Sequence, residues 1–486
     1  MTESPLTDVL ARIADQARPA RIPPDTWRKG IRRRRIRLAG GVLTVAVALA
    51  GGFLLFGHQG GQGIAPADAP RPVVPSDVYS PLTGEDTIVE APPGPAAILV
   101  AGDHELRGSD IWGWEGRSLL VGQNGSYRLA RTVGETNAGA GGLLLSPDGR
   151  YLASQPWIEG SQWAQDQTAV VDLVTGEVVQ YDGGFPMGWT PDSRSILLHS
   201  PPLVSYQVGD LRLLSLETGQ ARPLPEVEGR MRIGNFAAFS PDGARIAVAT
   251  EDALSVIDVA GNSVRKLVDL TARDRLAGPG AWLPDGKRIA TYTVGGCEEG
   301  ETCDERSLAQ RLFQVRYVDA DSGQPADGPR LAPARGLAAR MLGWQRDDAA
   351  VVAVYAPEKG AVKGPNDPNW SETDWWTVGG VDLRTFRADG SQRRLVDLPG
   401  SALFVDVPVN LLDRFGGPSP TPLEGAARWL LALYWPLGQV VELLIVIVIS
   451  VVILAIRGSA KRRVRAPTEP PFAPGTASST DGRPSD

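Results

Sequence analysis

The chain has few of the side chains that most often bind metals or carry out catalysis. Among 486 residues there are 3 histidines and 2 cysteines. The histidines, His58, His104 and His199, have no partner residues at the spacing of a metal-binding motif. A zinc site in a protein needs three or four such ligands. We therefore expect neither a metal nor another cofactor.

Motifs that position a nucleophile or cradle a phosphate are missing as well. The sequence contains no HExxH, no GxSxG nucleophile elbow and no phosphate-binding P-loop. No pair of carboxylates or histidines stands out as an acid and a base. The sequence therefore predicts a protein that is not an enzyme, and an enzyme with an unrecognised site is the remote alternative.

A basic stretch is absent from the middle of the chain, although arginine is common. The net charge is −7, and the basic runs lie near the two ends, "RKGIRRRRIR" at residues 28–37 and "RGSAKRRVR" at residues 457–465. Domains that bind nucleic acid usually carry a basic patch or stripe. We therefore expect no direct binding of nucleic acid.

Two apolar segments have the length of membrane spans. Residues 38–57 and 437–456 are each about twenty residues long, enough to cross the hydrocarbon core of a bilayer. The basic runs precede the first segment and follow the second, so the positive-inside rule places both termini in the cytoplasm. The sequence predicts a two-pass plasma-membrane protein that contacts lipid, with its middle part outside. A cleaved signal peptide is the alternative for the first segment, but residues 1–37 would be an unusually long segment before the apolar region of a signal peptide.

The two cysteines lie close together in the polar segment "GGCEEGETC". Disulfides form and persist in oxidising compartments such as the cell exterior. We therefore expect Cys297 and Cys303 to form a disulfide within one loop. This expectation agrees with an external location of the middle part.

One phrase recurs along the middle part of the chain. "LLLSPDGRYLAS" at residues 143–154 has further copies, and the five anchor positions are Pro147, Pro191, Pro241, Pro284 and Arg346. A repeat of about 45 residues indicates a repeat architecture. Proline, aspartate and glycine in this order suit a tight hairpin turn, because glycine accepts the left-handed conformation at its end. The copy at Arg346 has lost its proline and glycine, so the sequence leaves open whether it forms the same turn.

Each copy is followed by a second hairpin signature, such as "AVVDLVTGEVVQY", so that one repeat holds four short strands. Four strands per repeat are typical of a propeller blade. The sequence therefore predicts an all-β propeller of six or seven blades, with residues 96–102 and 401–410 pairing to close the ring. Residues 110–122 look like a degenerate first copy. A large apolar residue stands two positions before every anchor, and we expect it between neighbouring blades; these residues are Leu145, Trp189, Phe239, Trp282 and Trp344.

The repeated Ser-Pro-Asp-Gly phrase resembles the TolB-type, WD-like β-propeller repeat. This resemblance implies a platform that binds proteins or ligands. The arrangement of a short helix, a basic run, one span and a propeller also resembles actinobacterial membrane proteins that accompany extracytoplasmic-function sigma factors. That second resemblance implies a sigma factor as a cytoplasmic partner.

The N-terminal tail contains one amphipathic segment. In "SPLTDVLARIADQA" at residues 4–17, Leu6, Val9, Leu10 and Ile13 fall on one face of a predicted helix. A short isolated helix is marginal in water, so its apolar stripe requires a partner protein or the membrane surface. A targeting tail without any partner is the alternative.

Three insertions interrupt the repeats and carry the candidate binding residues. Residues 293–313 are acidic and contain the cysteine pair, whereas residues 356–380 and 155–168 are rich in tryptophan. Long loops on a rigid scaffold often carry recognition, and tryptophan is enriched at binding hot spots. The predicted partner or ligand surface consists of Trp370, Trp375, Trp376, Trp157 and Trp163. The alternative is that these side chains fold back over a blade edge.

Together these observations predict an external binding protein that signals inward through its tail. An envelope scaffold with inert tails is the alternative, and a propeller enzyme is the remote alternative. The predicted boundaries are a cytoplasmic tail (1–37), a span (38–57), a linker (58–95), the propeller (96–410), an interfacial segment (411–436), a second span (437–456) and a disordered tail (457–486).

Overall fold

The computed structural model describes residues 72–79, 86–102, 118–130, 143–155, 167–199, 210–230, 237–297, 301–364, 377–400 and 402–418. Both predicted spans and the predicted tail helix lie outside these residues. Within the described stretches, no helix is both long and apolar enough to cross a membrane.

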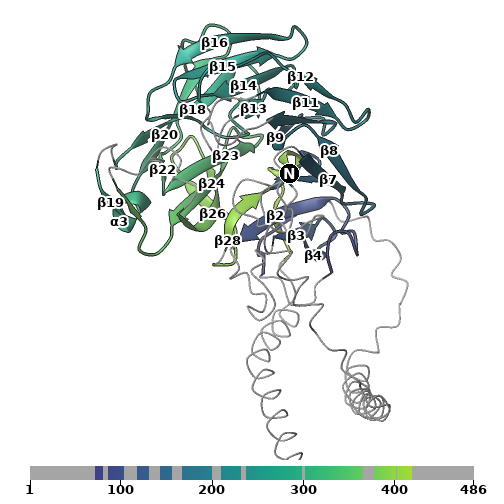
Figure 1. The fold of residues 1–486 in the computed structure, drawn as a ribbon. Coiled ribbons are helices and arrows are strands. Elements are labelled where there is room, and N and C mark those ends of the chain that lie inside the picture. The colour runs from purple at the N-terminus through teal and green to yellow at the C-terminus, as the bar shows by residue number, and fades with distance from the viewer. Residues whose placement is uncertain are drawn as a thin grey trace, which may run out of the picture. The chain divides into compact units, whose positions relative to one another are not determined.

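Most of the described strands form six antiparallel sheets of four or five strands, which Figure 1 shows arranged as the blades of a propeller, and two small sheets of two strands lie outside them. From the innermost strand outward, blade 1 contains β28 (Ala402–Asp406), β2 (Ala96–Gly102), β3 (Leu119–Gly122) and β4 (Tyr127–Leu129). Blade 2 contains β5 (Leu143–Leu145), β6 (Tyr151–Ser154), β7 (Gln167–Asp172) and β8 (Val178–Asp182). Blade 3 contains β9 (Phe185–Trp189), β10 (Ser195–His199), β11 (Leu211–Ser215) and β12 (Ala221–Pro223).

The other three blades follow the same order. Blade 4 contains β13 (Ala237–Phe239), β14 (Arg245–Ala249), β15 (Ala253–Asp258) and β16 (Ser263–Asp269). Blade 5 contains β17 (Asp274–Leu276), β18 (Arg288–Gly295), β20 (Leu312–Asp319) and β21 (Pro325–Ala326), with β22 (Ala334–Arg335) also pairing with β20. Blade 6 contains β23 (Ala338–Trp344), β24 (Ala350–Pro357), β26 (Val378–Phe386) and β27 (Gln392–Val396). The predicted all-β propeller is confirmed, and the number of blades is six.

The repeated phrase forms the turn between the first and second strands of a blade. In blade 2 the Ser146 hydroxyl donates a hydrogen bond to the Asp148 carboxylate (2.6 Å) and accepts one from the Tyr151 N–H (2.8 Å). The Asp148 carboxylate also accepts from the Arg150 N–H (3.0 Å). Gly149 closes the turn with a φ of 75°, in the left-handed region that favours glycine. The same bonds recur around Asp192 and Asp242.

The copy at Arg346 keeps its turn despite the lost proline and glycine. Asp348 takes the glycine position with a φ of 60°. The hairpin is one residue shorter than the others, because the Gln345 N–H donates to the Ala349 carbonyl (2.8 Å). Aspartate tolerates the left-handed conformation better than most side chains do. The open question about this turn is therefore answered by an aspartate in the role of glycine.

The large apolar residues lie between blades, as predicted. Three tryptophans donate an indole hydrogen bond to a backbone carbonyl of the preceding blade, at distances of 2.9–3.1 Å. Trp282, for example, is 3% exposed and donates to the Ala238 carbonyl of blade 4. Leu145 and Phe239 pack into apolar clusters that contain side chains of the preceding blade. The tryptophans therefore join blades through both apolar contact and a hydrogen bond.

The ring closes through the predicted pairing of β2 with β28. Leu99 lies opposite Asp406 in this antiparallel ladder, and Figure 1 shows the purple-blue β2 beside the yellow-green β28. The interpretation of residues 110–122 as a first copy of the phrase was wrong. β3, which belongs to that segment, is the third strand of blade 1, because β28 and β2 supply the first two. The turn between these two strands is replaced by the ring closure.

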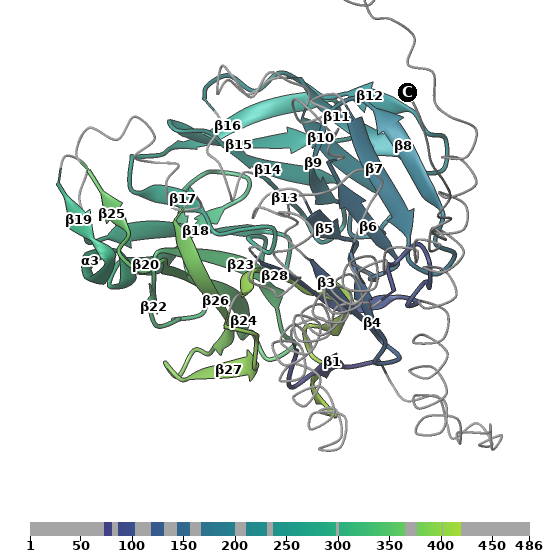
Figure 2. The same ribbon diagram turned by 60° about the horizontal axis from the view of Figure 1, so that its bottom comes forward.

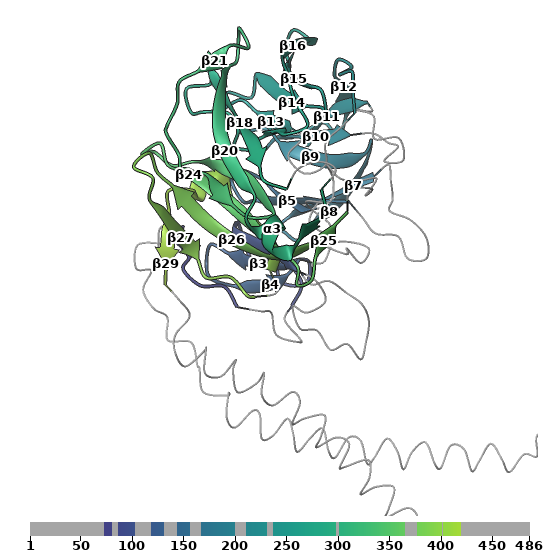
Figure 3. The same cartoon turned by 90° about the vertical axis from the view of Figure 1, so that its left-hand side faces the viewer.

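The segments that enter and leave the ring lie beside each other. β1 (Val74–Pro75) pairs in parallel with β29 (Phe415–Gly417), and Figure 3 shows β29 next to β27 of blade 6. The Val78 N–H donates to the Asp397 carbonyl (2.9 Å), which attaches the entering segment to the end of β27. The 3₁₀ helix η2 (Val409–Leu411) precedes β29. Residues 72–79 of the predicted linker thus take part in the fold.

Candidate binding face

The two faces of the ring differ in the kind of connection they carry. Within each antiparallel blade, the turns from the first to the second strand and from the third to the fourth strand lie on one face, which we call the tight-turn face. The connections from the second to the third strand, and those that lead to the next blade, leave from the opposite face, the long-connection face. This division follows from the strand order of the sheets.

All three predicted insertions leave from the long-connection face. Residues 155–168 lie between β6 and β7, residues 293–313 between β18 and β20, and residues 356–380 between β24 and β26. Each of these connections joins the second strand of a blade to the third. Trp157, Trp163, Trp370, Trp375 and Trp376 themselves lie outside the described residues. The strand order nevertheless brings their points of attachment to one face.

Two insertions from neighbouring blades combine into one small structure, which we call the platform (residues 296–297, 301–311 and 358–364). β19 (Cys303–Asp304) of the blade 5 insertion pairs in antiparallel fashion with β25 (Val362–Lys363) of the blade 6 insertion. The helix α3 (Glu305–Ala309) follows β19 directly and packs against β24 of blade 6. Figure 2 shows β19, β25 and α3 together at one edge of the ring. The insertions are therefore a shared structure and not two independent loops.

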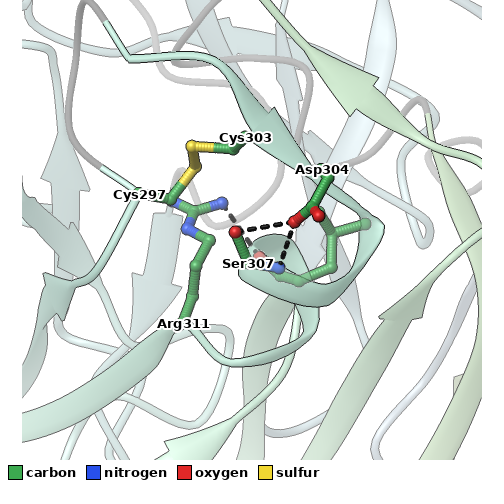
Figure 4. The surroundings of a disulfide bond; sticks show 6 residues. Cys297, Cys303, Asp304, Ser307 and Arg311 are labelled. Atoms are coloured by element: carbon green, nitrogen blue, oxygen red, sulfur yellow. Dashed lines mark hydrogen bonds between the residues drawn. A yellow bond between two sulfur atoms is a disulfide. The ribbon is translucent and has the colours of Figure 1, made fainter.

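Hydrogen bonds at the start of α3 fix the helix within the platform. The Asp304 carboxylate caps the helix by accepting hydrogen bonds from the Ser307 N–H (2.8 Å) and the Ser307 hydroxyl (2.7 Å), as Figure 4 shows. These two bonds hold the pKa of Asp304 below its usual value. The Glu305 carboxylate accepts from the Gly360 N–H of the other insertion (2.7 Å). One end of this helix thus joins blade 5 to blade 6.

A disulfide closes a short loop within the blade 5 insertion. Cys297 and Cys303 are bonded with an S–S distance of 1.95 Å. Cys303 is 2% exposed, whereas Cys297 is only partly buried. Arg311, near the end of the same insertion, is buried, and its guanidinium donates a hydrogen bond to the Leu337 carbonyl (3.0 Å). Figure 4 shows its side chain on the same side as the disulfide.

The base of the platform is an aromatic layer. The rings of Tyr292 and Phe313 meet edge to face at 5.8 Å, and the Arg311 guanidinium lies 5.6 Å from the Phe313 ring centre. Complete burial raises the pKa of the Tyr292 hydroxyl, so that it stays neutral. The outer side of the platform differs from this base, since Val362 on β25 is 62% exposed. The platform thus presents an apolar side chain on a well-supported structure.

A buried ion pair at the ring closure was not predicted from the sequence. Asp406 at the end of β28 lies 3.8 Å from the Arg340 guanidinium of blade 6 and accepts a hydrogen bond from the Leu145 N–H of blade 2 (3.1 Å). Burial raises the pKa of Asp406, although Arg340 and two backbone N–H groups favour its charged form. The only sequence signal was an aspartate and an arginine within predicted strands, far apart in the chain.

Side chains of the metal-binding kind are not clustered in the part of the chain that the structure describes. No group of three or more histidine, cysteine, aspartate or glutamate side chains there could hold a metal ion. The aspartates of the repeated phrase accept hydrogen bonds within their own turns. His199 is buried in blade 3.

Neither a family model nor a curated protein matches the chain. Among solved structures, TolB from Acinetobacter baumannii is similar with 16% sequence identity over 64% of this chain and a TM-score of 0.38. This chain covers 65% of the length of that TolB, just under two thirds. A TolB-type protein from Agrobacterium tumefaciens has 18% identity over 48% of this chain and 87% of that one, with a TM-score of 0.32. An oligogalacturonate lyase from Vibrio parahaemolyticus has 15% identity over 68% of this chain and 80% of that one, with a TM-score of 0.37. All three TM-scores are low, and the six-bladed propeller fold rests on the sheet order of the described residues.

Proposed function

We propose that this protein is a non-catalytic, membrane-anchored and extracytoplasmic binding protein whose partner, a protein, docks on the long-connection face. The observation that carries the proposal is the difference between the two faces. Insertions of neighbouring blades are joined into a platform on one face, whereas turns occupy the other. A rigid scaffold that carries elaborated loops on one side is a common arrangement for recognition.

The platform has the features of a docking surface for a protein. It exposes Val362 and also the charged side chains of Glu301 and Lys359. Protein interfaces combine an apolar centre with a polar rim. The sequence continues from β25 into residues 365–376, which contain Trp370, Trp375 and Trp376. Tryptophan is the residue type most enriched at interface hot spots.

A matched pair of exposed valines tests which face binds. Val362 lies on the platform and is 62% exposed, while Val174 lies in a turn of the tight-turn face and is 48% exposed. We expect Val362→Glu to lower the capture of extracytoplasmic partners at least about tenfold, because a charge in the centre of an interface remains unpaired there. Val174→Glu should leave capture unchanged. Crosslinking and mass spectrometry in native membranes provide the measurement, and equal capture by both variants would contradict the proposal.

Signalling to a sigma factor through Leu6, Val9, Leu10 and Ile13 is the second part of the proposal. The segments that enter and leave the ring pair with each other as β1 and β29. The chain therefore runs toward both predicted spans, residues 38–57 and 437–456, from one place on the propeller. A change in the pairing of β1 with β29 would then be transmitted to the tail.

Deletion of residues 2–20 separates a regulator from a scaffold. A sigma factor captured by the full-length protein and lost from the deletion variant is the outcome we expect. If both forms capture the same external partners and no cytoplasmic protein, the tails are inert and the scaffold alternative replaces the signalling part. An enzyme would instead require turnover that a carboxylate or histidine substitution abolishes.

A further inference from the structure

We propose that the Cys297–Cys303 disulfide is a thiol–disulfide exchange site that controls the conformation of the platform, with a dithiol protein as its reductant. This inference deepens the proposed function, since it concerns the same platform. Its chemical and structural parts can be tested without knowledge of the binding partner.

The two sulfur atoms differ in their access to an incoming thiolate. Cys303 is 2% exposed and begins β19, while Cys297 is only partly buried. Exchange depends on which sulfur can be reached and on the stability of the thiolates that form. Access by the incoming thiolate favours the partly buried Cys297 sulfur over the buried Cys303 sulfur. Attack is therefore expected at Cys297.

The exchange proceeds by two displacements. A thiolate of the reductant first bonds to the Cys297 sulfur, the Cys297–Cys303 bond breaks, and Cys303 leaves as a thiolate that takes up a proton from water. The second thiolate of the reductant then attacks its own partner sulfur in the mixed disulfide and releases Cys297 as a thiolate. Two electrons pass from the dithiol to the protein, and the reductant leaves as a disulfide.

The bond has a structural consequence because the elements around it are too short to be stable alone. β19 and β25 have two residues each, and α3 has five. An isolated pair of strands or a single helical turn is marginal at best in water. Cys297 also has a φ of 54°, a left-handed conformation that costs free energy for residues other than glycine. Reduction lets Cys297 relax and removes the covalent link between β18 and β19.

The rest of the ring does not depend on this bond. Buried apolar side chains of blades 2 and 3 form clusters that contain no platform residue. Reduction should therefore release β19 and α3 from β25 and leave the propeller folded. Because the sequence runs from β25 directly into residues 365–376, this release changes the attachment of the tryptophan segment.

Hydrogen exchange of the full-length protein in membrane vesicles tests the proposal, with reduced thioredoxin as the probe and oxidised thioredoxin as the control. We expect amide exchange at residues 303–309 and 360–363 to become about tenfold faster or more after reduction. Exchange at residues 143–154 of blade 2 should not change. The proposal is overturned if the disulfide resists the reductant while the ring is folded, if exchange is unaltered, or if all six blades accelerate.

Two variants sharpen the test. Cys297→Ser combined with Cys303→Ser should exchange at the reduced rate whether or not the reductant is present. A thioredoxin with a single active-site thiol should be trapped on Cys297, and trapping on Cys303 would contradict the proposed direction of attack. These readouts do not involve partner capture, so they can succeed even if the Val362→Glu experiment fails.

Discussion

The tight-turn face and the long-connection face are built at opposite ends of the same strands, yet they differ in how their structure is specified. On the tight-turn face, each turn is closed by its own residues, as the Ser146 and Asp148 side chains show. On the long-connection face, β19 obtains its partner from another blade, about sixty residues further along the chain. Local hydrogen bonds give the turns of the tight-turn face the same structure from copy to copy. Contacts between insertions give the long-connection face a structure that differs from blade to blade.

Ties between blades show the same difference. On the tight-turn face, the Arg245 guanidinium of blade 4 lies 2.9 Å from the Asp321 carboxylate of blade 5, and the Arg222 guanidinium of blade 3 donates to the Val259 carbonyl of blade 4 (2.9 Å). These ties use side chains of the repeated strands. The platform joins blades 5 and 6 through added segments instead. A scaffold that is fastened on one face leaves the other face able to change without loss of the fold.

The largest effect is expected at the ring closure, near the tight-turn face. Asp406→Ala leaves the buried Arg340 guanidinium without its carboxylate, which should lower the free energy of unfolding by about 3–5 kcal/mol. Chemical denaturation of the purified full-length protein measures this loss. As a control, Asp269→Ala removes the exposed ion pair with Lys266 and should leave the free energy of unfolding nearly unchanged. Similar losses for the two variants would show that the closure is not a special point of the ring.

A smaller loss is expected between blades. Trp282→Phe retains an aromatic ring but removes the indole N–H that donates to the Ala238 carbonyl, so we expect a loss of about 1–2 kcal/mol. Trp344→Phe should cost less, because Trp344 is less buried and its carbonyl partner is more easily reached by water. Thermal and chemical denaturation of both variants measure the difference. The reverse order would mean that the hydrogen bond matters less than the shape of the side chain.

The turns themselves should give the fold a dependence on acid. Hydrogen bonds from the Ser240 hydroxyl and the Ala244 N–H lower the pKa of Asp242 in the folded protein. A lowered pKa stabilises the fold above about pH 4 and loses that contribution as the pH falls through the folded value. Asp242→Asn should therefore reduce the loss of melting temperature between pH 6 and pH 3. A variant with the same acid sensitivity as the wild type would contradict this role.

The smallest effect on global stability is expected on the platform. Asp304→Ala removes the cap of α3, yet the free energy of unfolding of the whole domain should stay nearly unchanged. Hydrogen exchange at residues 305–309 should nevertheless become faster. The contrast with Asp242 compares one residue type on the two faces. A large global loss would show that the platform is part of the propeller core.

The sequence was informative wherever a structure depends on neighbours in the chain. The hairpin turn around Gly149 needs a glycine or a tolerant residue at one position, so its pattern is visible in every copy. The large apolar residues between blades, such as Trp282, were visible because each blade repeats the same need to fill the space next to its neighbour. The pairing of β2 with β28 could also be predicted, since both segments were strands left over at the two ends of the repeat.

Other features could not be predicted because their partners are distant in the chain. Nothing in the local pattern links Cys303 with Lys363, which lie opposite each other in the platform. The same holds for Arg340 and Asp406, which meet only when the last strand enters blade 1. The segment at residues 110–122 was misread for a related reason, because its strand position depends on which strands close the ring.

The repeat, its tight turns and the large apolar residues between blades could be recognised in the chain alone, because periodic local requirements leave periodic residues. The number of blades, the joining of two insertions into one platform and the buried ion pair at the ring closure emerged only from the tertiary structure. These outcomes depend on which distant segments become neighbours once the ring closes. Such contacts are set by the packing of the whole propeller and leave no regular spacing in the chain.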